Sequence, residues 1–152
     1  MRRVKVAILA LSIVGITSLS QYEGFSKTAY LDIVGVPTIG YGSTKGVKMG
    51  DRIDEKGARS RLLEEVKDEY GEAIKRCVKV PLHQYEYDAY ISFTYNVGAG
   101  AFCGSTLVKR LNEEKYDEAC GQLHRWNRAK GKVYQGLVNR REKEYKMCMG
   151  VA

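Results

Sequence analysis

Three residues near the start of the chain have the types and spacing to cut a glycosidic bond. Eight residues separate Glu23 from Asp32, and five separate Asp32 from Thr38. Enzymes that hydrolyse such bonds usually place a protonated and an ionised carboxyl group on either side of the bond. The two groups need different surroundings to keep different pKa values. Here Glu23 follows an apolar run and Asp32 stands beside a turn, which favours Glu23 as the acid and Asp32 as the base.

The elements that must position these side chains predict an α+β chain that is mostly helical. Glycines separate three short β-prone pieces, at residues 28–31, 36–39 and 46–49, which predicts a small antiparallel sheet with tight turns. After Asp54, a good N-cap, residues 55–77 carry apolar side chains at helical spacing with charged residues opposite. One helix of that length would span about 34 Å, enough to join two lobes.

Further helices are predicted after a break at Pro81. They cover residues 84–96, a stretch that begins at Ser105 or Thr106, residues 116–126 and a final helix from residue 136 to near residue 148. The aromatic residues of the first of these helices are typical of core packing. Residues 127–132 are predicted to form a basic loop before the final helix.

Three motifs of the chain resemble the phage-type lysozymes, glycoside hydrolase family 24. They are the Glu23, Asp32 and Thr38 spacing with the run Thr38-Ile-Gly-Tyr-Gly42, the stretch Tyr95-Asn-Val-Gly-Ala-Gly-Ala-Phe102, and Gly136-Leu-x-x-Arg-Arg-x-x-Glu144. The likeness extends from about Tyr22 to about Met147. One departure is Ser43, where the family often has His, and the missing His is expected to remove a structural ion pair without affecting the chemistry.

The resemblance implies a lysozyme-like fold with a small β-sheet lobe at residues 22–54, a helical lobe at residues 78–152, and the helix 55–77 between them. It implies hydrolysis of the β-1,4 bond between N-acetylmuramic acid and N-acetylglucosamine in peptidoglycan, with no metal or organic cofactor. Glu23 would protonate the leaving oxygen. Asp32 would orient the attacking water or stabilise the positive charge that develops on the sugar, and Thr38 would hold that water.

A water between the carboxyl groups implies the inverting arrangement, in which they stand about 6.5–9.5 Å apart. The candidate sugar contacts are Tyr41, Tyr95 and Asn96. Arg140 and Arg141 are either structural ion-pair residues or wall contacts, and we favour the structural role because the Arg fork suits partly buried pairing with carboxylates.

Two other functions are compatible with parts of the sequence. A lytic transglycosylase cuts the same bond without water and needs one acid/base, so the Asp32 and Thr38 pair argues against it. A basic, membrane-anchored module that only binds the wall would keep the charge but would not require the three-residue spacing.

Residues 1–21 are predicted to be an N-terminal signal-anchor segment. Arg2, Arg3 and Lys5 precede an apolar run, which is typical of an export signal, but serines, a threonine and a glycine make the run a poor permanent anchor. Cleavage before Gln21 is one possible fate. We favour retention, because Glu23 would otherwise lie next to a frayed terminus. The segment resembles signal-anchor-release sequences of some phage endolysins, which implies transient insertion of residues 4–20 in the inner membrane and later release to the periplasm.

Charge and cysteine content narrow the partners and the compartment. The formal net charge of +7 favours polyanions such as the bacterial wall, and no zinc spacing, RNA-binding motif or isolated basic arm points to nucleic acid. We expect a monomer. Four cysteines behind an export-like N-terminus favour two disulfides. Of three connectivities we favour Cys77–Cys103 with Cys120–Cys148, because the second pair falls on inward faces of two predicted helices; four buried thiols are the alternative.

Overall fold

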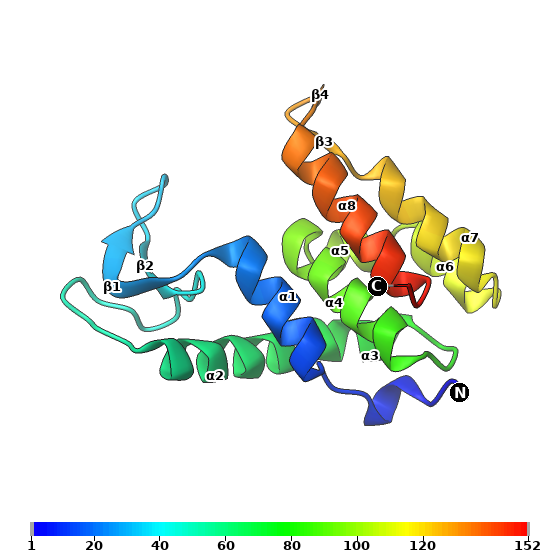
Figure 1. The fold of residues 1–152 in the computed structure, drawn as a ribbon, viewed down its shortest axis with the longest axis horizontal. Coiled ribbons are helices and arrows are strands. Elements are labelled where there is room, and N and C mark those ends of the chain that lie inside the picture. Colours follow the sequence, from blue (N-terminus) through cyan, green and yellow to red (C-terminus); the bar gives the residue numbers. More distant parts are fainter. Residues whose placement is uncertain (1, 152) are drawn as a thin grey trace.

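The computed structural model describes residues 2–151, and a long helix runs between a β-hairpin at one end and a group of helices at the other (Figure 1). The hairpin consists of β1 (Ser26–Leu31) and β2 (Pro37–Gly40), and it follows helix α1 (Ile13–Glu23). Met1, the first residue of the expected signal-anchor segment, and Ala152, the last residue of the expected helical lobe, lie outside the described residues. The chain is therefore mostly helical with small antiparallel sheets, as the sequence predicts.

The β-hairpin holds one bulge and lacks the third strand that we expected. Strands β1 and β2 pair Tyr30 with Thr38, and the register shifts between Ser26 and Tyr30. Residues 46–49 form turns instead of a strand. The physical reason is the pair Gly46 and Gly50, at φ 70° and 100°, whose left-handed backbone interrupts any extended run.

The long helix is made of three consecutive pieces, namely α2 (Glu55–Glu65), η2 (Val66–Gly71) and α3 (Glu72–Cys77). Asp54 begins it as expected, since its side chain accepts a hydrogen bond from the Gly57 N–H. The middle piece is a π-helical turn, which was not expected from the sequence. The turn ends just before Ala73 and Ile74, which are both buried.

Helix α4 (Gln84–Val97) lies at the centre of the helical part. Its residues from Glu86 to Thr94 are all buried, which is typical of a helix that is covered on every side. Helices α1 and α8 (Gln135–Cys148) pack against it. Tyr90 and Phe93 contact Phe102, so these aromatic residues belong to the core, as predicted.

The remaining helices close the core. They are α5 (Ala99–Cys103), α6 (Thr106–Asn112), α7 (Tyr116–Gln122) and the 3-10 turn η3 (Leu123–Arg125). Ser105 caps α6 by accepting from the Val108 N–H. The expected basic loop is a short hairpin of β3 (Arg128–Ala129) and β4 (Lys132–Val133). The cysteines pair as Cys77–Cys103 and Cys120–Cys148, the connectivity that we favoured.

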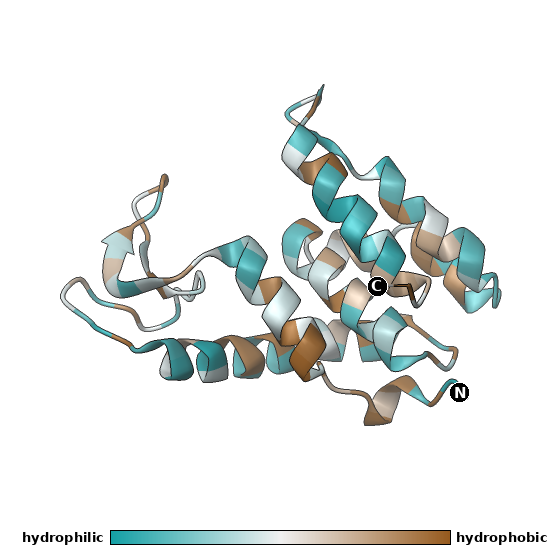
Figure 2. Ribbon diagram, viewed as in Figure 1, coloured by the Kyte–Doolittle hydropathy of each residue, from teal (hydrophilic) through white to brown (hydrophobic). Residues whose placement is uncertain are grey.

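The N-terminal segment is folded onto the helical part. It contains a 3-10 turn, η1 (Val6–Ile8), and it then enters α1; Figure 2 shows hydrophobic colour in both. Val4 exchanges two backbone hydrogen bonds with Leu82, at 2.9 and 2.8 Å. Leu19 of α1 is fully buried. No helix among residues 2–151 has both the length and the apolar character needed to cross a bilayer.

Candidate active site

Glu23 is the last residue of α1. The helix begins at Ser12, whose side chain accepts from the Gly15 N–H, and it ends because Gly24 takes φ 68°. The apolar run of the sequence is therefore the helix that carries Glu23. Strand β1 of the hairpin begins three residues later, at Ser26.

The carboxyl group of Glu23 is largely removed from water. Its side chain is 22% exposed, and Oε1 lies 3.5 Å from Nη1 of Arg140. Burial raises the pKa of the Glu23 carboxyl, and the Arg140 charge opposes this increase only in part. Tyr70 and Tyr95 face the same carboxyl, and its charge adds to the burial that raises the pKa of each tyrosine hydroxyl. These surroundings favour a carboxyl that keeps its proton, as a general acid must.

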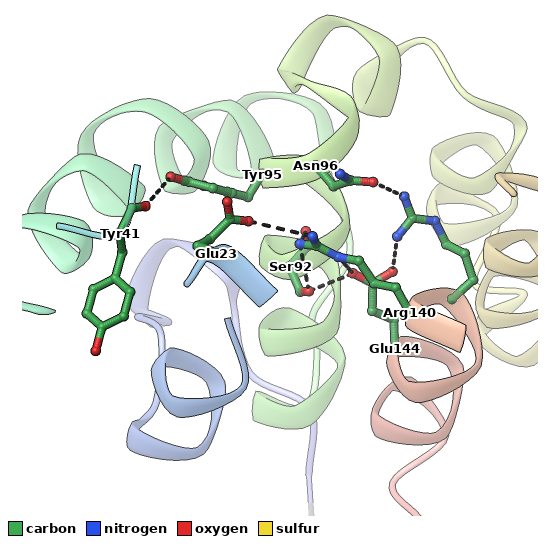
Figure 3. Close-up of polar contacts among 8 residues, drawn as sticks. Glu23, Tyr41, Ser92, Tyr95, Asn96, Arg140 and Glu144 are labelled. Carbon is green, nitrogen blue, oxygen red and sulfur yellow. Dashed lines mark hydrogen bonds and ion pairs between the residues drawn. The ribbon is translucent and has the colours of Figure 1, made fainter. Parts of the chain in front are cut away.

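Arg140 is fixed from three sides, as Figure 3 shows in part. Nη2 donates to the Ser92 carbonyl at 3.0 Å, Nε donates to Glu144 at 3.2 Å, and the guanidinium carbon lies 4.2 Å from the centre of the Tyr22 ring. The cation next to Glu23 is therefore held in place by groups on α1, α4 and α8. The sequence favours an ion pair for Arg140, but no pattern in it connects Arg140 with Glu23.

Arg141 has the structural role that we favoured. It is fully buried, and Nη1 donates to Glu144 at 2.6 Å while Nε donates to the Trp126 carbonyl at 2.9 Å. Its remaining nitrogen donates to Oδ1 of Asn96. Asn96, a candidate sugar contact, is exposed but shares its side-chain oxygen with this network.

Asp32 and Thr38 lie together at the turn of the β-hairpin. Oδ1 of Asp32 accepts from the N–H groups of Val34 and Val36, both at 2.9 Å. The Thr38 hydroxyl donates to the carbonyl of the same Val36 at 2.9 Å, and Thr38 is 5% exposed. The backbone of Val36 therefore contacts both side chains. Within residues 2–151 no hydrogen bond joins either of them to Glu23.

A cavity of about 500 Å³ lies between the loop after β2 and the long helix, and Gly42 in its lining is close to Glu23. Gly42, Tyr70 and Tyr95 contribute to its lining. A Cβ on Gly42 would lie 4.0 Å from Oε2 of Glu23 and 3.7 Å from the Tyr95 hydroxyl oxygen. Tyr95 therefore stands where a bound sugar could meet it, and glycine keeps the approach to Glu23 open.

Tyr41, the third candidate sugar contact, has a buried side chain. It is 4% exposed, and its hydroxyl donates to Glu55 at 3.1 Å. Figure 3 shows the ring pointing away from Glu23, while the carbonyl accepts from the Tyr95 hydroxyl at 3.4 Å. A sugar contact by Tyr41 remains a prediction. The direction of its ring could not be predicted, because β2 ends one residue earlier and strand alternation gives no guide there.

Ser43 retains a polar contact at the position where the resemblance led us to expect a His. Its hydroxyl donates to Oε2 of Glu65 at 3.0 Å. Among residues 2–151, no three His, Cys, Asp or Glu side chains gather as a metal site would require.

Comparisons with known proteins point to one family. The family model described as phage lysozyme matches residues 20–144. The SAR-endolysin of Pseudomonas phage phiKMV is 38% identical over 147 residues, which cover 94% of this chain and 89% of that protein. The endolysin of Bacillus phage PZA is 39% identical over 142 residues, 90% of this chain, and the chain spans about half the length of that relative, 54%.

The fold gives the same result. A variant of P22 lysozyme superposes with a TM-score of 0.85 and 35% sequence identity, covering 93% of this chain and 99% of that chain. The residues that the family model matches span Glu23, Asp32, Thr38 and Arg140. On its sequence and its fold, the chain belongs to the phage lysozyme family.

Proposed function

We propose that the protein is an endolysin that hydrolyses the β-1,4 bond between N-acetylmuramic acid and N-acetylglucosamine in peptidoglycan. The observation that carries the proposal is the environment of Glu23, a desolvated carboxyl with a raised pKa at the edge of a cavity. Membership of the phage lysozyme family and the SAR-endolysin names of its relatives support it.

In the proposed reaction, Glu23 gives its proton to the glycosidic oxygen as the bond to the leaving sugar breaks. Arg140 remains 3.5 Å from the carboxyl and stabilises the carboxylate that results. The cation thus supports the product of proton transfer, while burial supports the reactant. A general acid of this kind typically contributes roughly 10²- to 10⁴-fold to the rate.

The attacking water is held on the hairpin side. The Thr38 hydroxyl already gives its proton to Val36, so it offers lone pairs that accept a hydrogen bond from water. Asp32 uses Oδ1 for two backbone N–H groups, and Oδ2 makes no hydrogen bond within the described residues, which leaves that oxygen to orient the water or take its proton. Two acceptors on one water favour direct attack with inversion.

The N-terminal segment indicates where in the cell the protein would act. The relatives named SAR-endolysins support export by the host, tethering to the inner membrane through residues 4–20, and release to the periplasm. Tethered protein is inactive in this scheme, since a helix held in lipid cannot also bring Glu23 to Arg140. In this scheme the released protein has the fold described above.

Glu23→Gln tests the proposal, with Glu113→Gln just after α6 as a matched control at an exposed ion pair. Both purified proteins are added to outer-membrane-permeabilised cells, and turbidity is followed. We expect Glu23→Gln to lose at least about 100-fold in lytic rate with an unchanged circular dichroism spectrum, and the control to match wild type. Wild-type lysis in the Glu23→Gln protein would refute the role of Glu23.

The products separate the alternatives. A hydrolase leaves a reducing N-acetylmuramic acid, whereas a lytic transglycosylase leaves an anhydro-sugar at the same position. A module that only binds the wall releases neither product. Mass spectrometry of the soluble fragments therefore distinguishes the three functions in one experiment.

A further inference from the structure

Asp88 is a buried carboxylate outside the candidate active site. It lies in the first half of α4 and is 4% exposed. Among the described residues it has no cationic partner within ion-pair distance, and three donors reach it instead. Two of them belong to Ser12, the backbone N–H at 3.0 Å and the hydroxyl, and the third is the Gln84 side chain at 2.9 Å. A buried carboxylate is tolerated only when such donors satisfy it.

The neighbouring contacts bind the same segment to α4. Nε2 of Gln84 also donates to the Ala10 carbonyl at 2.8 Å. The Arg3 guanidinium makes two hydrogen bonds with Glu86, at 2.9 and 3.0 Å. Gly15 passes so close that a Cβ there would lie 2.8 Å from Oδ1 of Asp88. The start of α4 is therefore shaped to receive one particular alignment of residues 3–15.

The alignment matters because Ser12 is also the residue that begins α1. Its hydroxyl oxygen accepts from the Gly15 N–H while its proton goes to Asp88, so one side chain both docks and caps the helix. A slip by one residue would put Leu11 or Ile13 opposite Asp88 and leave the carboxylate unpaired. The same slip would rotate α1 by about 100° and move Glu23 by about 1.5 Å along the helix axis.

We propose that Asp88 is a positioning residue for the reaction: it selects the register in which the N-terminal segment docks on α4, and through Ser12 and α1 it sets the position of Glu23. The inference rests on the proposed role of Glu23 as the catalytic acid. Asp88 does not touch the substrate. It acts by making every other register of the segment unfavourable.

The test compares Ser12→Ala, Asp88→Ala and the double variant with wild type, using full-length protein purified from the soluble fraction. Both single variants should lower kcat by roughly 10- to 100-fold on soluble peptidoglycan fragments while KM stays unchanged, because displacement of a catalytic group by about 1 Å has effects of this size. The double variant should be no worse than either single one. Ser12→Thr, which keeps the hydroxyl, should retain wild-type kcat.

The pH profile separates positioning from loss of stability. A displaced Glu23 loses burial, so its pKa should fall towards the ordinary value and the alkaline limb of kcat/KM should move to lower pH. Ser105→Ala removes the comparable N-cap of α6, away from the site, and should lower the melting temperature without moving that limb. Should Asp88→Ala fail to fold, Ser12→Ala and Ser12→Thr decide the question alone.

The outcomes also separate this inference from the proposed function. Lytic activity in Glu23→Gln would overturn both. An inactive Glu23→Gln protein, together with wild-type kcat and an unmoved alkaline limb in Ser12→Ala and Asp88→Ala, would overturn only the role of Asp88.

Discussion

The proton on Glu23 is controlled by two opposing effects. Burial raises the carboxyl pKa above its ordinary value of 4.5, and the Arg140 charge lowers it, with burial as the larger effect. Because the folded state binds the proton more tightly than the unfolded state, this group stabilises the fold below about pH 4.5. The contribution disappears as the pH rises through the raised pKa of the folded protein. Catalysis by the protonated form should disappear over the same range.

Arg140→Gln should therefore shift the alkaline limb of kcat/KM to higher pH. Without the cation, burial acts alone on Glu23 and the carboxyl keeps its proton longer. Glu144 still has Arg141 as a partner, so the buried network retains one cation. The measurement is the pH dependence of kcat/KM, with Lys143→Gln on the exposed side of α8 as the control. A shift to lower pH in Arg140→Gln would contradict the assignment.

At this scale the sequence reveals residue types and spacing but not partners. The interval from Glu23 to Thr38 pointed to the catalytic candidates because the turn that joins them is local. Arg140 lies far along the chain, and no local pattern links it to Glu23. The direction of the Tyr41 ring could not be predicted for a related reason: it depends on where β2 ends, and the packing of the whole lobe sets that point.

The long helix shows what periodicity can and cannot predict for an element. Its apolar residues recur every four positions, at Ala58, Leu62, Val66, Tyr70 and Ile74. An α-helix has 3.6 residues per turn, so a strict four-residue repeat drifts by about 40° at each step. The π-helical turn widens the helix in the middle of this run and returns Ile74 to the core. The helix itself was predictable from the spacing of its apolar residues. The π-helical turn could be expected only by calculating the drift of the four-residue repeat.

The two disulfides should differ in what they contribute to stability. They span similar lengths of chain, 26 and 28 residues, so loop closure predicts about 3–4 kcal/mol for each. Cys120 and Cys148 are fully buried next to the Tyr90 hydroxyl, whereas Cys77 and Cys103 are half-buried. Replacing the buried pair by alanines should therefore lower the free energy of unfolding by roughly 1–2 kcal/mol more, because cavities form in the core.

Urea unfolding of the two double-alanine variants measures this difference. Each variant serves as the control for the other, since the entropic part is nearly equal. A larger loss of unfolding free energy from the Cys77 and Cys103 pair would contradict the argument from burial.

For the whole molecule, the proposed release from the membrane requires the N-terminal segment to suit two surroundings, lipid and the fold. In the fold, Ile16 and Leu19 are buried against the helical part, but Ile13 remains 83% exposed. An exposed isoleucine contributes little to the docked fold, yet it is suited to lipid. The sequence predicted both the export character and the helix that carries Glu23. It could not say which face would dock, because the polar residues of this segment are spread around the helix and mark no outer side.

The exposed face of α1 offers a way to change tethering without changing the enzyme. Ile13→Asn should weaken the membrane-inserted state, and Thr17→Leu, at an exposed position of the same helix, should strengthen it. Each change should shift the free-energy difference between the membrane-inserted and folded states of the segment by about 1 kcal/mol or more, because apolar atoms gain their transfer energy in lipid while both positions face water in the fold.

We expect earlier lysis and less membrane-bound protein for Ile13→Asn, and the reverse for Thr17→Leu. The readouts are lysis time and the membrane fraction of each variant, and kcat of the purified released proteins should equal wild type. Equal membrane fractions in all three proteins would mean that the segment does not exchange between lipid and fold.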